Sequence, residues 1–128
     1  MTDILLDTNF LVYCAKQKVD YLEKIKEIVS GKTNLLVLSP VFCEIKNLSE
    51  KSKKLKNRNS AKLALKILKL HLLKKKIRIM KTDKQADRAI EEIVKKARKK
   101  IIVATADREL KRKIKRHAQI LSISDLKH

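Results

Sequence analysis

A short apolar run that ends in three polar residues constrains the fold of this chain more than any other feature. The aliphatic residues 4–6 are followed at once by Asp7, Thr8 and Asn9. Three large aliphatic side chains in a row leave no polar face, which is typical of a strand buried on both sides. Such strands belong to parallel sheets covered by helices, where functional residues follow the carboxyl ends of the strands. Asp7 stands at that position.

The same pattern returns near the other end of the chain. The aliphatic residues 101–104 are followed by Thr105, Ala106 and Asp107. In a parallel sheet, both strands would place an aspartate on the same rim. The alternative for each aspartate is that it caps the helix that follows, a role that Asp fills well. Two such aspartates together favour a functional site over two independent caps.

Strand and helix signals alternate along the rest of the chain. Short aliphatic runs predict further strands at residues 35–38, 77–79 and 120–123, with the residues from 124 onward as a short tail. Apolar residues at helical spacing predict helices at residues 10–15, 20–29, 42–48, 60–72, 86–97 and 108–116. The length suits one domain, residues 1–128. This alternation predicts an α/β fold, a three-layer α/β/α sandwich around a parallel sheet of four or five strands.

Polar residues and the single glycine predict several helix ends. Gly31 is expected to terminate the helix at residues 20–29 as a C-terminal cap. Asn59 or Ser60 is expected to cap the next long helix. Thr82 and Gln85 have the spacing of a capping box ahead of the helix that follows them.

The charge balance is the strongest signal in the composition. The chain has 33 Lys and Arg residues against 14 Asp and Glu, a formal net charge of +19. A heat-adapted surface usually carries matching acids for ion pairs, and here the acids are too few. The unpaired positive charge favours a polyanionic partner, first nucleic acid and second an anionic membrane surface. Because aromatic residues make up only 3% of the chain, contact with backbone phosphates is expected rather than base stacking.

The cysteines and the lack of membrane signals bear on the compartment. Cys14 and Cys43 are too few for a disulfide framework and lack metal-motif spacing, so both are expected to be reduced, buried thiols. The sequence has no apolar run of membrane-spanning length and no signal-peptide pattern at its N-terminus. These features predict a soluble, cytoplasmic protein with no membrane partner.

Four acids near strand ends or helix starts form the main candidate site: Asp7, Glu44, Asp87 and Asp107. If they converge, their charges repel, and one would take up a proton unless a cation neutralised them. Oxygen ligands favour Mg²⁺ or Mn²⁺, and an acidic metal pocket in a basic surface suits phosphodiester hydrolysis. The alternative for Glu44 and Asp87 is a simple interaction with a helix dipole. The sequence contains no glycine-rich phosphate loop, zinc motif or nucleophile elbow that would indicate another chemistry.

Four segments, taken in order, carry a family resemblance. They are residues 6–11 (Leu-Asp-Thr-Asn-Phe-Leu), Ser39-Pro40 followed by Glu44, residues 86–90 (Ala-Asp-Arg-Ala-Ile) and residues 104–110 (Ala-Thr-Ala-Asp-Arg-Glu-Leu). Over essentially its whole length the chain resembles the PIN-domain ribonucleases, and the first and last segments are the most specific. The last segment and the lysine-rich middle most resemble archaeal relatives of the endonuclease that processes small-subunit ribosomal RNA. Toxins of the VapC type share the same acids and are the alternative subfamily.

The resemblance implies roles for individual residues. Asp7, Glu44, Asp87 and Asp107 match the catalytic acids that bind the metal, and Asn9 and Thr105 match positions that often support the site. Asp83 competes with Asp87 but fits the family spacing less well. Residues 98–100 (Arg-Lys-Lys) stand where relatives commonly have a glycine turn, a departure that concerns the loop and not the acids.

The resemblance also implies an activity and partners. It points to an endoribonuclease that uses Mg²⁺ or Mn²⁺, leaves 5′-phosphate and 3′-hydroxyl ends, and acts in ribosomal RNA processing. Two alternatives stay open, a non-catalytic RNA-binding module of ribosome assembly and a VapC-type toxin ribonuclease with an antitoxin partner. Relatives often dimerise, so a homodimer is a further partner to consider.

The stretch 50–58 is expected to be a frayed helix end or an exposed loop. The basic residues expected to follow the RNA backbone are Lys51, Lys53, Lys54, Lys56, Arg58, Lys111, Arg112 and Lys113.

Overall fold

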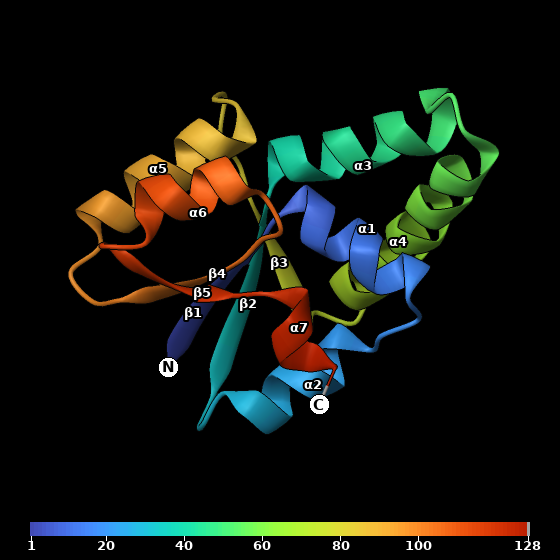
Figure 1. Ribbon diagram of the computed structural model, residues 1–128. Helices are drawn as coiled ribbons and strands as arrows, with labels where there is room; N and C mark the ends of the chain where they lie inside the picture. The colour runs from blue at the N-terminus through green and yellow to red at the C-terminus, as the bar shows by residue number, and fades with distance from the viewer. Residues whose placement is uncertain (128) are drawn as a thin grey trace.

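The computed structural model describes residues 1–127, and a parallel sheet of five strands forms its centre (Figure 1). All strand pairs are parallel, in the order β3-β2-β1-β4-β5. The strands are β1 (Thr2–Leu6), β2 (Thr33–Leu38), β3 (Ile77–Met80), β4 (Ile101–Ala104) and β5 (Ala118–Leu121). The predicted parallel-sheet sandwich is therefore confirmed.

The two aliphatic segments from opposite ends of the chain lie side by side in the middle of the sheet. β1 is the central strand, and its Leu5 lies beside Leu36 of β2 and Val103 of β4. Residues 4–6 and all of β4 are buried, which accounts for their lack of polar side chains. Between β1 and β4 the strand order reverses, and ligands of open α/β sheets bind at such a point.

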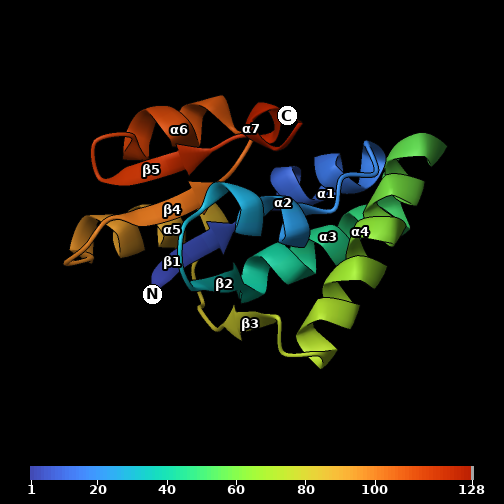
Figure 2. The ribbon, with the colours of Figure 1, turned by 90° about the horizontal axis from the view of Figure 1, so that it is seen from below.

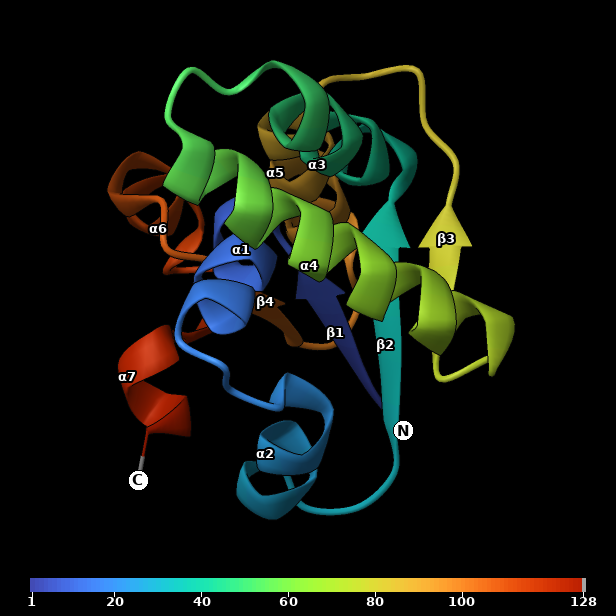
Figure 3. The same cartoon turned by 90° about the vertical axis from the view of Figure 1, so that its right-hand side faces the viewer.

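Seven helices within residues 1–127 cover the sheet. They are α1 (Thr8–Lys16), α2 (Tyr21–Ile28), α3 (Ser39–Lys51), α4 (Leu55–Leu73), α5 (Ala86–Lys96), α6 (Arg108–Ile114) and α7 (Ile123–Leu126). In Figure 3, α1, α2 and α4 lie in front of the strands, and α5 and α6 lie behind them. α3 and α4 pack along each other, and Figure 2 shows them beside α1, away from α5 and α6. Right-handed crossovers explain the division, because the chain runs outward from β1 to β3 and then returns to β4 and β5.

Several predicted helix starts are wrong. α1 begins at Thr8, directly after β1, and not at Phe10. The stretch 50–58 was expected as a frayed helix end or an exposed loop, but α3 runs to Lys51 and α4 begins at Leu55, so only residues 52–54 lie outside a helix. Ser60 lies inside this helix and donates to the carbonyl of Lys56 at 3.0 Å, as serine does within a helix, so neither it nor Asn59 is a cap.

The capping box predicted before α5 is also wrong. The hydroxyl of Thr82 accepts a hydrogen bond from the backbone N–H of Lys84 at 3.2 Å, which closes a local turn. Gln85 stands at the N-cap position of α5 without a side-chain bond to the helix. α2 ends at Ile28 with Val29 as its C-cap, so Gly31, with φ of +78°, serves the turn to β2 and does not cap the helix.

The last strand was predicted at residues 120–123 and lies two residues earlier, as β5. β5 ends at Leu121, because Ser122 begins a capping box with Asp125 and starts α7 where a tail was expected. The backbone N–H of Ser122 donates to the Asp125 carboxylate at 2.8 Å.

Both cysteines are free thiols, but only one of them is buried. Cys14 lies in the core, and burial raises its pKa to about 12. Cys43 is exposed on α3, contrary to prediction. None of the helices described in residues 1–127 is long and apolar enough to cross a membrane.

Candidate active site

The four predicted acids line one small cavity at the carboxyl end of the sheet. Each comes from a different element, since Asp7 follows β1, Glu44 lies in α3, Asp87 in the first turn of α5, and Asp107 just before α6. Figure 1 shows α1, α3, α5 and α6 gathered at the end of the sheet opposite the N-terminus. The cavity has a volume of about 130 Å³ and is lined by Asp7, Thr8, Asn9, Glu44, Ala86, Asp87 and Asp107.

Thr105 joins two of the acids. Its side chain is fully buried, and its hydroxyl donates to Oδ2 of Asp7 at 2.7 Å. The same hydroxyl oxygen accepts a hydrogen bond from the backbone N–H of Asp107 at 3.1 Å. The predicted supporting position of Thr105 therefore lies in contact with the acids at the ends of both β1 and β4.

A second threonine, which the sequence analysis did not single out, supports Glu44. The hydroxyl of Thr8 donates to Oε2 of Glu44 at 2.6 Å. Thr8 is buried at the start of α1, directly after Asp7. In the sequence, Thr8 is recognisable only as a hydroxyl residue in the polar segment after β1. Its partner Glu44 lies 36 residues away, so no local pattern indicates the hydrogen bond.

The capping alternative holds for one aspartate of the pair and not for the other. Asp107 caps α6, because its Oδ1 accepts from the backbone N–H groups of Glu109 at 2.9 Å and Leu110 at 3.2 Å. Asp7 stands at the N-cap position of α1, but its side chain makes no capping bond there and turns to Thr105 instead. Asp87 accepts from the backbone N–H of Arg88 at 2.9 Å.

The carboxyl groups of Asp7 and Glu44 are held in an environment that favours their neutral form. Burial raises the pKa of Asp7, the hydrogen bond from Thr105 lowers it, and the charges of Asp107 and Asp87 raise it further. Desolvation also raises the pKa of Glu44, although the residue as a whole is exposed, and the charges of Asp7 and Asp87 add to the effect. The charges of neighbouring acids therefore act on both Asp7 and Glu44, and a cation in the cavity would offset this repulsion and the cost of desolvating the two carboxylates.

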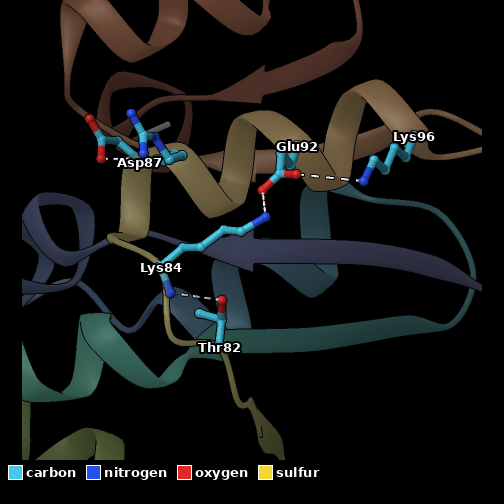
Figure 4. Close-up of polar contacts among 6 residues, drawn as sticks. Thr82, Lys84, Asp87, Glu92 and Lys96 are labelled. Carbon is cyan, nitrogen blue, oxygen red and sulfur yellow. Dashed lines mark hydrogen bonds and ion pairs between the residues drawn. The ribbon is translucent and has the colours of Figure 1, made fainter.

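Asp87 differs from the other acids of α5. Figure 4 shows Glu92 between Lys84 and Lys96, with which it forms ion pairs, while Asp87 points away from this cluster. The hydrogen bond from Lys84 lowers the pKa of Glu92. Glu91 pairs with Lys95 and Glu92 with two lysines, and neither lines the acidic cavity, so Asp87 is the acid of α5 that is available to a ligand there.

The cavity fits a hard divalent cation by its chemistry. Carboxylate, hydroxyl and amide oxygens line it, and no sulfur or imidazole ligand competes there. Within residues 1–127, no three His, Cys, Asp or Glu side chains converge on one point as they stand. Asp7 and Glu44 each accept a hydrogen bond from a threonine through one oxygen, and Asp107 accepts from the α6 amides through one oxygen. The other oxygen of Glu44 and that of Asp107 make no hydrogen bond within residues 1–127.

Of the two remaining candidates, Asn9 lines the acidic cavity and Asp83 does not. Asn9 lines the acidic cavity and is exposed, and no side-chain hydrogen bond within residues 1–127 joins it to the acids. Asp83, the competitor of Asp87, lies in the loop before α5 and is not part of the cavity lining. The choice of Asp87 therefore agrees with the geometry.

The predicted basic residues lie on two elements. Lys51, Lys53, Lys54, Lys56 and Arg58 run from the end of α3 into the start of α4, and Lys111, Arg112 and Lys113 lie on α6. Nε of Arg58 is buried and has no hydrogen-bond partner in the described part of the chain. On α6, a guanidinium nitrogen of Arg112 lies 3.4 Å from Oε1 of Glu109, which forms an ion pair. The charge of Lys113 on the same helix helps to lower the pKa of Glu91 on α5. The first group is therefore the less neutralised of the two.

Comparisons with known proteins show the family to which this chain belongs. The family profile described as PIN like domain matches residues 4–124. The chain is similar to Ribonuclease VapC4 of Methanocaldococcus jannaschii, with 34% identity over 114 residues that cover 89% of this chain and 83% of that protein. Its structure is similar to that of the PIN domain endonuclease Utp24, with a TM-score of 0.69, 25% identity, and coverage of 94% of this chain and 84% of that one.

A more distant structure shares the fold. VapBC-1 from nontypeable Haemophilus influenzae gives a TM-score of 0.53 at 14% identity, covering 94% of this chain and 98% of that one. The profile spans nearly the whole chain, and the sheet order, the acidic cavity and the sequence segments are all consistent with it. The chain belongs to the PIN-domain ribonuclease family.

Proposed function

We propose that this chain is an Mg²⁺- or Mn²⁺-dependent endoribonuclease that hydrolyses RNA at the acidic cavity. The observation that carries the proposal is the convergence of Asp7, Glu44, Asp87 and Asp107, from four elements, on one cavity of a chain with a net charge of +19. Membership of the PIN family supports nuclease chemistry. A basic surface would attract the RNA, and the acids would hold the cation that hydrolysis needs.

The protein's own side chains would do the positioning. The four acids would hold the ion, with Thr105 and Thr8 fixing the carboxylates of Asp7 and Glu44 through the hydrogen bonds described above. When bound, Mg²⁺ or Mn²⁺ would supply an activated water and neutralise charge on the attacked phosphate. In-line attack of water on phosphorus, with departure of the 3′ oxygen, leaves 5′-phosphate and 3′-hydroxyl ends. Lysines of the stretch 51–58 would hold the flanking phosphates.

For the biological role we propose ribosomal RNA processing in the cytoplasm, which rests on the sequence resemblance of residues 104–110 and the lysine-rich middle. A second candidate is a toxin ribonuclease with an antitoxin partner, and the 34% identity to Ribonuclease VapC4 favours it. An antitoxin gene beside the gene for this chain would favour the toxin, and its absence would argue for RNA processing. A homodimer remains a prediction that sedimentation can test in either case.

The first experiment is cleavage of a structured ribosomal RNA fragment in Mn²⁺, with EDTA and Asp107→Asn as controls. Asn caps a helix about as well as Asp, so this variant should keep the α6 cap and remove only the charge. We expect cleavage that is lost in both controls, with RNA binding retained by the variant. Cleavage that survives in Asp107→Asn would contradict the proposal. Tight, salt-sensitive binding with no cutting in any metal would favour a non-catalytic RNA-binding module of ribosome assembly.

A further inference from the structure

A second cavity opens beside the acidic one and shares a residue with it. Its volume is about 270 Å³, and it lies between α1 and α4. Asn9 lines both cavities, and Ala106 of the second cavity directly precedes Asp107. If a phosphate-linked polymer binds with one phosphate at the acids, the unit next to that phosphate would therefore lie at the second cavity.

The polar side chains of this second cavity are free for a ligand. Asn9, Tyr13 and Lys16 come from α1 and Asn57 from α4, and all four are exposed. No side-chain hydrogen bond within residues 1–127 engages any of them. Ser60 also lines the cavity, but its hydroxyl already donates to the Lys56 carbonyl. The fold itself makes no use of two amides, a phenol and an ammonium gathered in one place.

Tyr13 is the residue that identifies the class of ligand. The chain has two Tyr, two Phe and no Trp, and of these only Tyr13 is exposed, with 44% of its surface open. Phe10 and Tyr21 instead pack edge-on against each other in the core. An exposed ring offers a stacking surface to a base, and side-chain amides can pair with base edges. Lys16 adds a cation for a phosphate.

We propose that the second cavity is a subsite for one unpaired nucleotide of the RNA, next to the phosphate that is cut. Tyr13 would stack on the base, Asn57 would contact the base edge and Lys16 the adjoining phosphate. The inference rests on the proposed nuclease function for the place of the cut phosphate. The low aromatic content predicts binding mainly through phosphate contacts, and the proposed subsite adds one stacking position to them. Because stacking on Tyr13 needs an unstacked base, single-stranded RNA is favoured over a duplex.

The test measures binding in the Asp107→Asn background, where cleavage is expected to be absent. The probes are labelled single-stranded hexauridylate and hexaadenylate, and a blunt RNA duplex, and the binding of each variant is compared with that of the Asp107→Asn parent on the same probe. We expect Tyr13→Ala to weaken binding of the hexamers about tenfold, while Tyr13→Phe, which keeps the ring, stays close to the parent. Asn57→Ala should weaken binding and alter the preference between the two hexamers. Asn59→Ala is the matched control, because Asn59 is an exposed α4 residue outside the cavity lining.

The outcomes separate this inference from the nuclease proposal. If Asp107 is required for cleavage but Tyr13→Ala binds the hexamers as well as Tyr13→Phe does, the subsite is overturned and the nuclease function stands. If Tyr13→Ala and Asn57→Ala lose hexamer binding although no metal supports cleavage, the subsite stands and the nuclease function fails. An equal loss of duplex and hexamer binding in Tyr13→Ala would overturn the assignment to an unpaired nucleotide.

Discussion

The hydroxyl of Thr105 donates a 2.7 Å hydrogen bond to the carboxylate of Asp7, although the two residues are 98 positions apart. The bond spans the pairing of β1 with β4, where Leu6 lies beside Ala104. Since the same hydroxyl also accepts from the backbone of Asp107, one buried side chain sets the relative position of two proposed metal ligands.

Replacing this hydroxyl should affect both stability and cleavage. Thr105→Val keeps the shape but leaves the buried Asp7 carboxylate without its donor, which should lower the free energy of unfolding by about 1–3 kcal/mol. Thr105→Ser retains the hydroxyl and should lose less. Urea unfolding at pH 7 and RNA cleavage rates measure the two effects. Equal losses in the two variants would show that the hydrogen bond contributes little.

The part of the site that was predicted from the sequence depends on local patterns. Asp7 and Asp107 follow buried aliphatic strands, and parallel pairing brings such strand ends to one rim whatever the loops do. Glu44 and Asp87 were candidates from their positions near helix starts, but the family segments were needed to favour a metal site, because an acid that only meets a helix dipole has the same local appearance. The bond from Thr8 to Glu44 depends on the packing of α1 against α3, which no local pattern encodes.

The helix boundaries were predicted less well, for a physical reason. A Ser or Thr can cap a helix, bond back to a carbonyl one turn earlier or close a local turn, and the sequence does not distinguish these uses. Ser60 takes the second course and Thr82 the third. Ser122 caps α7, which was overlooked because the apolar residues around it extend the strand pattern.

Asp87 and Glu92 provide a matched comparison on one helix. Asp87→Asn should reduce cleavage by at least about a hundredfold, the upper range for residues that only orient a metal ligand. Glu92→Gln removes one negative charge as well, but Glu92 pairs with Lys84 and Lys96 outside the acidic cavity, so cleavage should be unchanged. Rates under identical Mn²⁺ concentrations test this. Similar losses in the two variants would indicate a general effect of charge on α5.

Divalent ions should stabilise the protein through the acidic cavity. An ion that binds only the folded state adds about 2.7 kcal/mol when its free concentration is a hundred times Kd, so Mn²⁺ should raise Tm by several degrees. Asp7→Asn should lose this rise, yet without metal it should be at least as stable as the parent because its buried charge is gone. Thermal unfolding with Mn²⁺ and with EDTA measures both, and Glu27→Gln, at an exposed position of α2, is the control. A rise retained in Asp7→Asn would place the ion elsewhere.

His71 should make stability fall at acid pH. It packs edge-on against Tyr21, with ring centroids 5.6 Å apart. Burial lowers its pKa from the usual 6.5, Asp20 acts against this and Lys74 adds to it. The folded state therefore binds fewer protons than the unfolded state, and stability falls as the pH drops from above 6.5 toward the lowered pKa. His71→Phe keeps a ring but cannot titrate, so the parent should lose more stability than the variant between pH 8 and pH 5. Parallel losses in urea unfolding would contradict this.

The basic stretch between α3 and α4 should set the salt dependence of RNA binding. Asn57, within that stretch, lines a cavity that shares Asn9 with the acidic cavity, so the stretch begins the helix that forms one wall of the proposed RNA path. Each phosphate contact on single-stranded RNA contributes about 0.7 to the slope of log affinity against log salt. Changing Lys53, Lys54 and Lys56 to Gln should therefore reduce the slope by up to about 2. The control makes the same charge change further along α4, at Lys62, Lys66 and Lys69. If both triple variants reduce the slope equally, the net charge and not this stretch attracts the RNA.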